Sequence, residues 1–472
     1  MPITTSSALT PSSAMPRRAP DQPSLSTSRA WDPLRARALR AHRRIVTVTT
    51  PTNHLANASL AEGRDIGGVM RDEVVGLDEL VPLLGGGLVP YVNLDNAATT
   101  PPLRAVVDAV QRFLPMASSV HRGSGYKSRL STEMFEDARQ AVGDLVGADP
   151  DRDVVVFTKN TTEAINRFAH TMTVPEDSVV LTTVLEHHSN LLPWRRRGQV
   201  VHVGASADGV IDENDLDAQL AAHAGHVALL AVTGASNVTG IVPAIHQMAA
   251  KVHAVGGRIL VDAAQLAGHR PIDMGRHDTA EHIDAIALSA HKLYAPYGSG
   301  ALITARDCLS TDPDECGGGT VHAVTLDDVV WADLPDRAEA GSPNLLGAVA
   351  FAAAIRRLQE IGLDAIAAHE DRLTIYAREQ LAALDGVSVF GPAAPGLGVI
   401  PFTVTGWHHQ LIAAVLAHEH GIGVRSGCFC AQPLPATPVI SELARRFHSR
   451  DGRRLGAGGL RCVPAQVSAV RQ

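Results

Sequence analysis

The chain has 472 residues, a net charge of −8 and 45% hydrophobic residues, enough for two domains or for one large domain with an appendage. This charge offers no basic face for nucleic acid, and no apolar run reaches the roughly 18 to 20 residues of a membrane span. Five cysteines in so long a chain are too few for a disulfide framework. The composition therefore predicts a cytoplasmic protein without nucleic-acid or membrane partners.

The N-terminal part is expected to differ from the rest of the chain. Residues 1–45 are rich in Ser, Thr, Pro, Ala and Arg and have few acids, so we predict a disordered tail. The arginines also resemble those of an organelle transit peptide, and an over-extended start site is a third interpretation. We expect residues 46–100 to pack on the core, with a short helix over 77–84.

Residues 101–340 alternate short apolar runs with amphipathic segments, which is typical of a mainly parallel sheet covered by helices on both faces. We predict seven strands, at 154–157, 179–182, 200–203, 227–232, 258–261, 286–288 and 301–303. After Gly341 the pattern changes to long helices followed by short strands. We therefore predict an α/β protein with a large domain over 101–340 and a smaller α+β domain over 341–472.

Polar residues stand where several core strands should end, and ligands of such sheets bind at the carboxyl ends of strands. Lys292 follows the apolar run ending at Leu288 and is one of only four lysines. A free ammonium is costly to bury, whereas a lysine amine can lose its proton and form an imine. We expect Lys292 to hold an aldehyde cofactor; the alternative is a lysine that reaches out to solvent.

Three other strand ends carry comparable residues. Thr161 and Thr162 open a helix, which suits a phosphate or simply a helix cap. Asp262 follows an apolar strand and needs a partner, such as a pyridinium N–H, unless it is a helix cap; Gln265 could then reach a phenolic oxygen. His187 could stack on a flat ring and move protons. The His187-His188 pair also suggests a metal, but no third ligand stands at metal spacing, and we predict none.

Taken together, these segments resemble the class V, fold-type I pyridoxal-phosphate enzymes, specifically the cysteine desulfurase and selenocysteine lyase group. The matching segments follow the family's order over about residues 74–461. They are Leu94-Asp95-Asn96-Ala97-Ala98-Thr99-Thr100, His121-Arg122-Gly123, Thr161-Thr162-Glu163-Ala164-Ile165-Asn166, Glu186-His187-His188-Ser189-Asn190, Ser236-Asn237-Val238-Thr239-Gly240, Val261-Asp262-Ala263-Ala264-Gln265, Ser289-Ala290-His291-Lys292-Leu293-Tyr294, Glu339-Ala340-Gly341-Ser342-Pro343-Asn344 and Arg425-Ser426-Gly427-Cys428-Phe429-Cys430-Ala431-Gln432-Pro433.

The resemblance implies pyridoxal 5′-phosphate as cofactor and assigns a role to each site residue. Lys292 would attach the cofactor, Asp262 would bind the pyridine nitrogen, and His187 would stack on the ring. The other implied contacts are Gln265 and Asn237 to the phenolic oxygen, with Thr161, Thr162, Ser289 and His291 to the phosphate. Gly341 and Ser342 resemble a loop that reaches the partner subunit's phosphate, which implies a homodimer.

The resemblance also names the reaction. Cys430 stands where the desulfurases carry the cysteine that attacks the substrate's sulfur, so the products would be alanine and a persulfide that passes to a sulfur-acceptor protein. The substrate would be L-cysteine or L-selenocysteine, and Arg461, with Asn237, would bind it. Cys428 would be a relay thiol or inert; a Cys-x-Cys metal pair is the less favoured interpretation.

The C-terminal end departs from the family, because Cys462-Val463-Pro464-Ala465-Gln466 does not match its continuation and the small domain is shortened. Two alternatives to a desulfurase stay open. One is another class V enzyme, such as an aminotransferase or a carbon–sulfur lyase, against which Cys430 argues; the other is a non-catalytic homologue, which the shortened end suggests.

Overall fold

The structure is a computed structural model, and it describes residues 65–206, 208–309, 312–392, 396–431 and 465–468. The predicted tail over 1–45 lies outside these residues. The predicted domain boundaries stay predictions. Among the described helices, none combines the length and the apolar character that crossing a bilayer requires.

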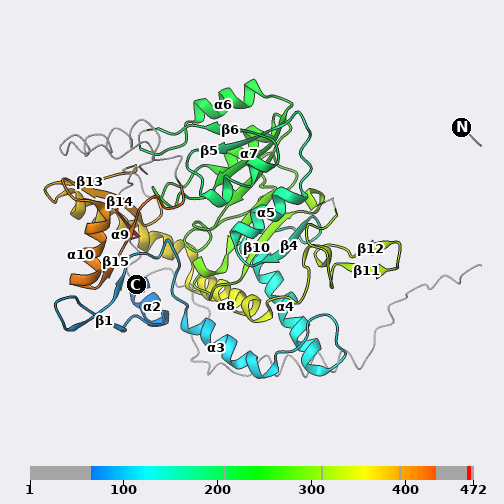
Figure 1. Cartoon of the computed structure of the whole chain (residues 1–472), viewed down its shortest axis with the longest axis horizontal. Helices are drawn as coiled ribbons and strands as arrows, with labels where there is room; N and C mark the ends of the chain where they lie inside the picture. Colours follow the sequence, from blue (N-terminus) through cyan, green and yellow to red (C-terminus); the bar gives the residue numbers. More distant parts are fainter. Residues whose placement is uncertain (1–64, 207, 310–311, 393–395, 432–464, 469–472) are drawn as a thin grey trace, which may run out of the picture. The chain divides into compact units, whose positions relative to one another are not determined.

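A seven-stranded sheet forms the centre of the fold, with the strand order β4-β10-β9-β8-β7-β5-β6 (Figure 1). Strand β10 runs antiparallel to both its neighbours, and the pairs from β9 through to β6 are parallel. The predicted mainly parallel sheet is thus confirmed. The strands are β4 (Asp153–Thr158), β5 (Val179–Thr183), β6 (Gln199–Val203), β7 (Val227–Thr233), β8 (Arg258–Asp262), β9 (Ala285–Ser289) and β10 (Gly300–Ala305).

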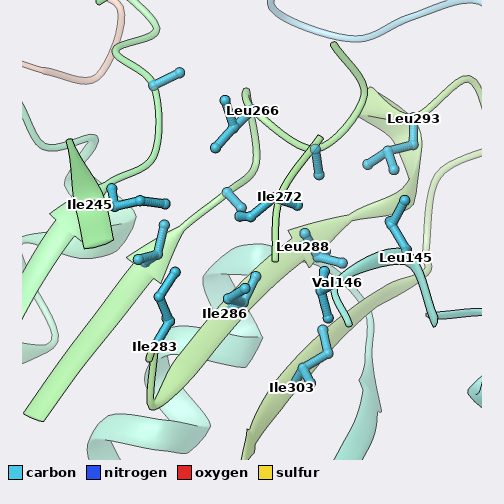
Figure 2. Packing of buried hydrophobic residues seen from close by; sticks show 14 of the residues in the cluster. Leu145, Val146, Ile245, Leu266, Ile272, Ile283, Ile286, Leu288, Leu293 and Ile303 are labelled. Carbon is cyan, nitrogen blue, oxygen red and sulfur yellow. The ribbon is translucent and has the colours of Figure 1, made fainter. Parts of the chain in front are cut away.

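The two faces of the sheet are buried in separate apolar clusters, as the side-chain alternation of a strand requires. In β9, Ile286 and Leu288 belong to one cluster, whereas Ala285 and Ala287 belong to the other. Figure 2 shows the first cluster, where Ile286 and Leu288 pack beside Ile303. Because both faces are covered, the sequence of such a strand is apolar throughout, which is why the seven runs were recognisable.

Helices cover both faces. Residues of α5 pack in the cluster that contains Ala285 and Ala287, whereas residues of α3, α4, α6, α7 and α8 pack in the cluster of Figure 2. Leu345 and Val349 of α8 also pack with Phe113 and Phe135 of α3 and α4. These helices are α3 (Arg104–Phe113), α4 (Tyr126–Leu145), α5 (Thr161–Thr171), α6 (Glu213–Ala222), α7 (Ile245–His253) and α8 (Leu345–Ile361).

The C-terminal part has its own four-stranded sheet, in the order β13-β14-β17-β16, next to the helices α9 and α10. Residues 465–468 form β17 and pair with both β14 and β16. The elements are α9 (Leu363–Ala382), β13 (Val387–Val389), β14 (Val399–Val404), α10 (His409–His420), β15 (Ile422–Gly423), β16 (Arg425–Ser426) and β17 (Ala465–Ser468).

The helix predicted over 77–84 is wrong. This segment contains β1 (Leu80–Pro82), which pairs antiparallel with β2 (Leu88–Pro90), and the nearby helix α2 lies earlier, at Ile66–Glu73. Pro82 cannot donate a backbone hydrogen bond, and the glycines at 85–87 allow the chain to reverse, so a hairpin is favoured. A second hairpin, β11 (Val321–Val324) with β12 (Val329–Trp331), projects from the sheet in Figure 1.

Candidate active site

A cavity of about 220 Å³ opens at the carboxyl ends of the parallel strands. Nine of the predicted site residues line it, although they come from segments more than 100 residues apart. These are Thr161, Thr162, His187, Asn237, Asp262, Gln265, Ser289, His291 and Lys292. Convergence at this edge of the sheet is what parallel topology predicts for a ligand site. The role of each residue stays a prediction.

Lys292 ends the short helix that follows β9, and its half-buried side chain lines the cavity. Burial lowers the pKa of Lys292, and the carboxylate of Asp262 offsets part of that shift. The backbone at Lys292 is closely packed, since a Cβ at Gly268 would lie only 2.8 Å from the Lys292 carbonyl oxygen. The cavity therefore holds a primary amine that is fixed in place and loses its proton more readily than usual.

Asp262 is the last residue of β8 and is buried. Its Oδ1 accepts a hydrogen bond from the Ala264 backbone N–H at 3.0 Å, and within the described residues Oδ2 has no hydrogen-bond donor. Burial raises the pKa of Asp262, against the opposing effects of that bond and of Lys292. A buried carboxylate of this kind is stabilised by a cationic N–H donor in the cavity, as a pyridinium would supply.

The start of α5 forms the polar end of the cavity. Asn160 caps the helix, because its Oδ1 accepts from the Glu163 backbone N–H. The Thr161 and Ser289 hydroxyls lie 2.7 Å apart, and the Thr162 hydroxyl lies 2.7 Å from that of Ser189. Hydroxyls and backbone N–H groups at a helix N-terminus suit a phosphate dianion.

The His187 ring has a defined tautomer. The Ser189 backbone N–H donates to His187 Nδ1 at 3.1 Å, so Nδ1 is an acceptor and the neutral ring carries its proton on Nε2. Burial, with Lys292 and His188, lowers the pKa of His187 to about 4, and burial with Lys292 does the same to His291. Both rings are neutral at neutral pH, and His187 can stack on an aromatic ring without adding charge.

Two amide side chains connect the cavity to distant loops. Gln265 donates to the Ala97 carbonyl oxygen at 2.8 Å, which anchors the segment after β3 (Val92–Asn93). Asn237 donates to the Phe429 carbonyl oxygen at 2.8 Å, although we predicted that it contacts a cofactor oxygen and the substrate. The structure therefore assigns Asn237 a further contact, with the segment that carries Cys430.

Cys430 lies outside the residues that line the cavity, on the turn after β16, and its side chain is exposed. The turn is tight, with φ angles of 50° at Phe429 and 54° at Cys430. The His188 backbone N–H donates to the Cys430 carbonyl oxygen at 2.7 Å, which ties the turn to the loop of His187. Cys428 is half-buried and packs against the core, whereas Cys430 is exposed.

An ion pair fixes the start of this turn. Arg425 donates through Nε and one NH₂ group to the two carboxylate oxygens of Asp95, at 2.9 and 3.1 Å. Asp95 belongs to the same segment that Gln265 anchors. The bidentate geometry fixes the direction of the Arg425 side chain as well as its position.

The remaining predicted residues are not in the cavity. Gly341 and Ser342 are exposed on the surface, and the Gly341 N–H donates to the Gly318 carbonyl oxygen at 2.7 Å. Gly341 has a φ of 86°, a conformation that favours glycine. Arg461 lies outside the described residues, so its predicted role stays a prediction.

Glu186 and Ser189 were quoted in the sequence motif without a role, and the structure places both beside His187. Glu186 is fully buried, and its carboxylate accepts from the Thr183 hydroxyl, the Asn190 amide and the Thr233 N–H at 2.6 to 3.0 Å. Burial raises the pKa of Glu186 to about 8. In the sequence, the only signal was an acidic residue next to a pair of histidines. The structure adds that Glu186 is buried and hydrogen-bonded next to His187.

The fold and the site together define a class. A lysine in the cavity wall, a buried aspartate and a hydroxyl-rich helix start, around one cavity at a sheet edge, fit the amine, pyridine nitrogen and phosphate contacts of pyridoxal phosphate. The residues present therefore suit this cofactor, and the class is that of the fold-type I pyridoxal-phosphate enzymes.

Comparisons with known proteins give the family. Residues 92–446 match the family Aminotransferase class-V. A cysteine desulfurase from Haloferax volcanii is 36% identical over 73% of this chain and 82% of its own. Among solved structures, apo cysteine desulfurase from Thermococcus onnurineus has a TM-score of 0.71 at 31% identity, over 81% of this chain and 91% of its own. The cysteine desulfurase CsdA from Escherichia coli has a TM-score of 0.68 at 30% identity, over 80% and 90%.

The chain therefore belongs to the class V aminotransferase family and, within it, to the pyridoxal-phosphate-dependent cysteine desulfurases. The predicted family, fold and cofactor are confirmed.

Proposed function

We propose that this protein removes sulfur from L-cysteine and leaves L-alanine and a persulfide on Cys430. The observation that carries the proposal is the attachment of the Cys430 turn to the cavity. His188 and Asn237 bond the backbone of the turn at Cys430 and Phe429, and Asn237 also lines the cavity. A turn that is bonded to residues of the cavity and exposes its cysteine suits a thiol that must receive sulfur from a substrate and then pass it on.

The residues that line the cavity have separate tasks in this reaction. Lys292 would attach the cofactor and, as an amine with a lowered pKa, would move the proton of the substrate's α-carbon. Asp262 would hold the proton on the pyridine nitrogen, and His187 would orient the ring through stacking. When bound, pyridoxal phosphate withdraws electrons from the substrate amino acid and so weakens the bonds next to its α-carbon.

The transfer of sulfur to Cys430 needs only the enzyme thiol and the substrate. The Cys430 thiolate attacks the sulfur of the substrate, the new S–S bond forms and the substrate's C–S bond breaks. The carbon that loses sulfur receives the electron pair and then a proton, which gives alanine. One L-cysteine and one enzyme thiol therefore yield one L-alanine and one enzyme persulfide, with no external oxidant.

Partners are part of the proposal. An exposed Cys430 favours transfer of the persulfide sulfur to an acceptor protein, because a buried persulfide would be inaccessible. The exposed Gly341 and Ser342 are consistent with a second copy of the chain that contributes to the cofactor site of the homodimer. Arg461 would bind the substrate carboxylate through its guanidinium fork.

The test compares two cysteines that are two residues apart. The holoenzyme, Cys430→Ser and the matched control Cys428→Ser are given L-cysteine, and alanine and cyanide-reactive persulfide are measured. We expect equal amounts of both products in the wild type and in Cys428→Ser, and neither in Cys430→Ser. Alanine and persulfide at wild-type rates in Cys430→Ser would contradict the proposal.

A parallel assay with L-selenocysteine separates the two activities of the group. Alanine formation from selenocysteine that survives Cys430→Ser would make this protein a selenocysteine lyase, because the carbon then keeps the electron pair and selenium leaves as elemental selenium without a thiol that accepts it.

A further inference from the structure

Three potential metal ligands meet at the end of the sheet opposite the cavity. His253 ends α7, whereas His282 and Asp284 lie in the loop that enters β9. Lys292 follows the other end of β9, and Figure 2 shows Ile283 just before this strand and Leu288 near its far end. This second cluster is therefore separate from the cofactor site and plays no part in the proposed reaction.

The two histidine rings are oriented by backbone carbonyl groups. The Nδ1 of His253 lies 2.6 Å from the Ala280 carbonyl oxygen, and the Nδ1 of His282 lies 2.8 Å from that of Thr279. A carbonyl oxygen only accepts, so each Nδ1 must be the donor, and in a neutral ring Nε2 then carries a free lone pair. A backbone carbonyl that fixes the tautomer through Nδ1 is a common support of metal-binding histidines.

The Nε2 atoms of the two stacked rings both lie near the same carboxylate. His253 Nε2 lies 2.9 Å from Asp284 Oδ2, and His282 Nε2 lies 3.5 Å from Asp284 Oδ1. One ligand atom from each of the three residues lies within 4.8 Å of the others. Two nitrogen lone pairs and a carboxylate repel one another unless a cation, either a proton or a metal ion, lies between them.

The neighbouring charged groups already have partners of their own. Arg258 lies 3.7 Å from Asp284 Oδ1, but it pairs more closely with Asp307, at 2.9 Å. His277 Nε2 lies 2.9 Å from Asp153. Asp284 is buried, whereas both histidine rings are half-buried, so water can complete the coordination shell from the open side.

We propose that His253, His282 and Asp284 bind a divalent transition-metal ion of the Zn²⁺ class. Two imidazoles and one carboxylate are the ligands that such an ion prefers, and water would fill the remaining position. The ion would join the end of α7 to the start of β9 and so stabilise this edge of the sheet. The competing occupant is a proton shared between His253 and Asp284.

The test measures binding of Zn²⁺ and Co²⁺ to the full-length, untagged holoenzyme with Cys428→Ser and Cys430→Ser, which removes the thiols nearest the cavity. Titration calorimetry at pH 8 gives stoichiometry and affinity, and the visible absorption of bound Co²⁺ reports the ligands. We expect one equivalent per chain, a Co²⁺ spectrum without a thiolate band and a higher thermal midpoint with Zn²⁺.

The variants are His282→Ala, the polar His282→Gln and the matched control His246→Ala. His246 lies on the same helix as His253 and bonds a carbonyl of the same loop, that of Glu281, but is outside the cluster. We expect both His282 variants to weaken Zn²⁺ binding by at least about tenfold and to lose the thermal shift, while His246→Ala keeps both. The cofactor's absorption reports that each variant is folded.

Two outcomes would overturn the proposal. The first is stoichiometric binding that the His282 variants leave unchanged, which would place the metal elsewhere. The second is no binding of either ion to the parent protein at micromolar concentration, which would leave the shared proton as the occupant.

Discussion

The active site has two parts that are held in different ways. Lys292 and Asp262 stand at the ends of neighbouring buried strands, where burial lowers the pKa of the amine and raises that of the carboxyl. Cys430 has an exposed side chain, on a turn that is held by backbone hydrogen bonds and by the ion pair of Arg425 with Asp95. One part is built into the core of the sheet, and the other presents its thiol to solvent.

The difference follows from what each part must do. A cofactor that stays on the enzyme needs fixed partners whose protonation is set by burial, and ends of core strands provide both. A thiol that receives sulfur and passes it to another molecule must be accessible, because a buried thiol could not be reached by that molecule. If this contrast is right, substitutions in the buried part should affect the reaction far more than substitutions that loosen the turn.

The largest effect is expected for Lys292→Ala. Removal of the amine removes both the covalent attachment of the cofactor and the proton transfer at the α-carbon, so alanine formation should fall by about a thousandfold or more. The visible absorption of the attached cofactor should disappear. Lys251→Ala is the matched control, because the Lys251 amine pairs with Glu213 and Asp217 away from the cavity. Equal loss in both variants would disprove the assignment.

Asp262→Asn should have the next largest effect. It keeps the shape of the side chain but removes the charge that holds the pyridine proton, so kcat should fall on the order of a hundredfold. Cofactor binding measured by absorption should weaken less than kcat. A variant that stays within threefold of the wild-type rate would show that this buried carboxylate does not act on the cofactor.

Glu186→Gln tests whether burial keeps the carboxyl group of Glu186, next to His187, protonated in the folded protein. The folded protein holds the Glu186 proton up to a pKa of about 8, whereas the ordinary value is 4.5, so unfolding releases a proton between these limits. The free energy of unfolding should therefore fall by about 1.4 kcal/mol per pH unit in this window as the pH rises. Glu186→Gln should lack this decline. Denaturant titrations of both proteins from pH 5 to pH 9 measure the free energy of unfolding. If it depends on pH in the same way in both proteins, the prediction is contradicted.

The smallest effect is expected for Asp95→Asn, which breaks the ion pair with Arg425. Both side chains are partly exposed, so global stability should change by less than about 1 kcal/mol. Persulfide formation in a single turnover should slow by only about twofold to fivefold, since the hydrogen bonds of His188 and Asn237 still hold the turn. A loss as large as that of Lys292→Ala would mean that the turn is as finely positioned as the buried part.

Much of the fold could be predicted from the sequence because the strands of a doubly covered sheet are apolar throughout. The seven predicted strands agree with β4 to β10 to within two residues at each end. The helix predicted over 77–84 failed because a short apolar segment has no clear period, and its pairing with Leu88–Pro90 is a tertiary contact. Strand order and the reversed direction of β10 could not be predicted, since both depend on which strands meet.

The site shows the same division. Charged residues at or soon after the ends of apolar strands, such as Asp262 and Lys292, were recognisable because a charge is costly to bury without a partner. The contact of Asn237 with Phe429 was not recognisable, nor was the group of His253, His282 and Asp284. Metal spacing in the sequence gave no sign of this group, because its histidines are almost 30 residues apart and come together only through packing.

The sequence by itself determined the strands, the polar residues at their ends and, through the ordered motifs, the family and its cofactor. These features depend on the local pattern of apolar and polar residues along the chain. Only the tertiary structure decided which of these residues share a cavity, how burial shifts the pKa values of Lys292, Asp262, Glu186 and His187, and which nitrogen of each histidine is free. Those properties depend on neighbours in space, and the neighbours come from distant parts of the chain.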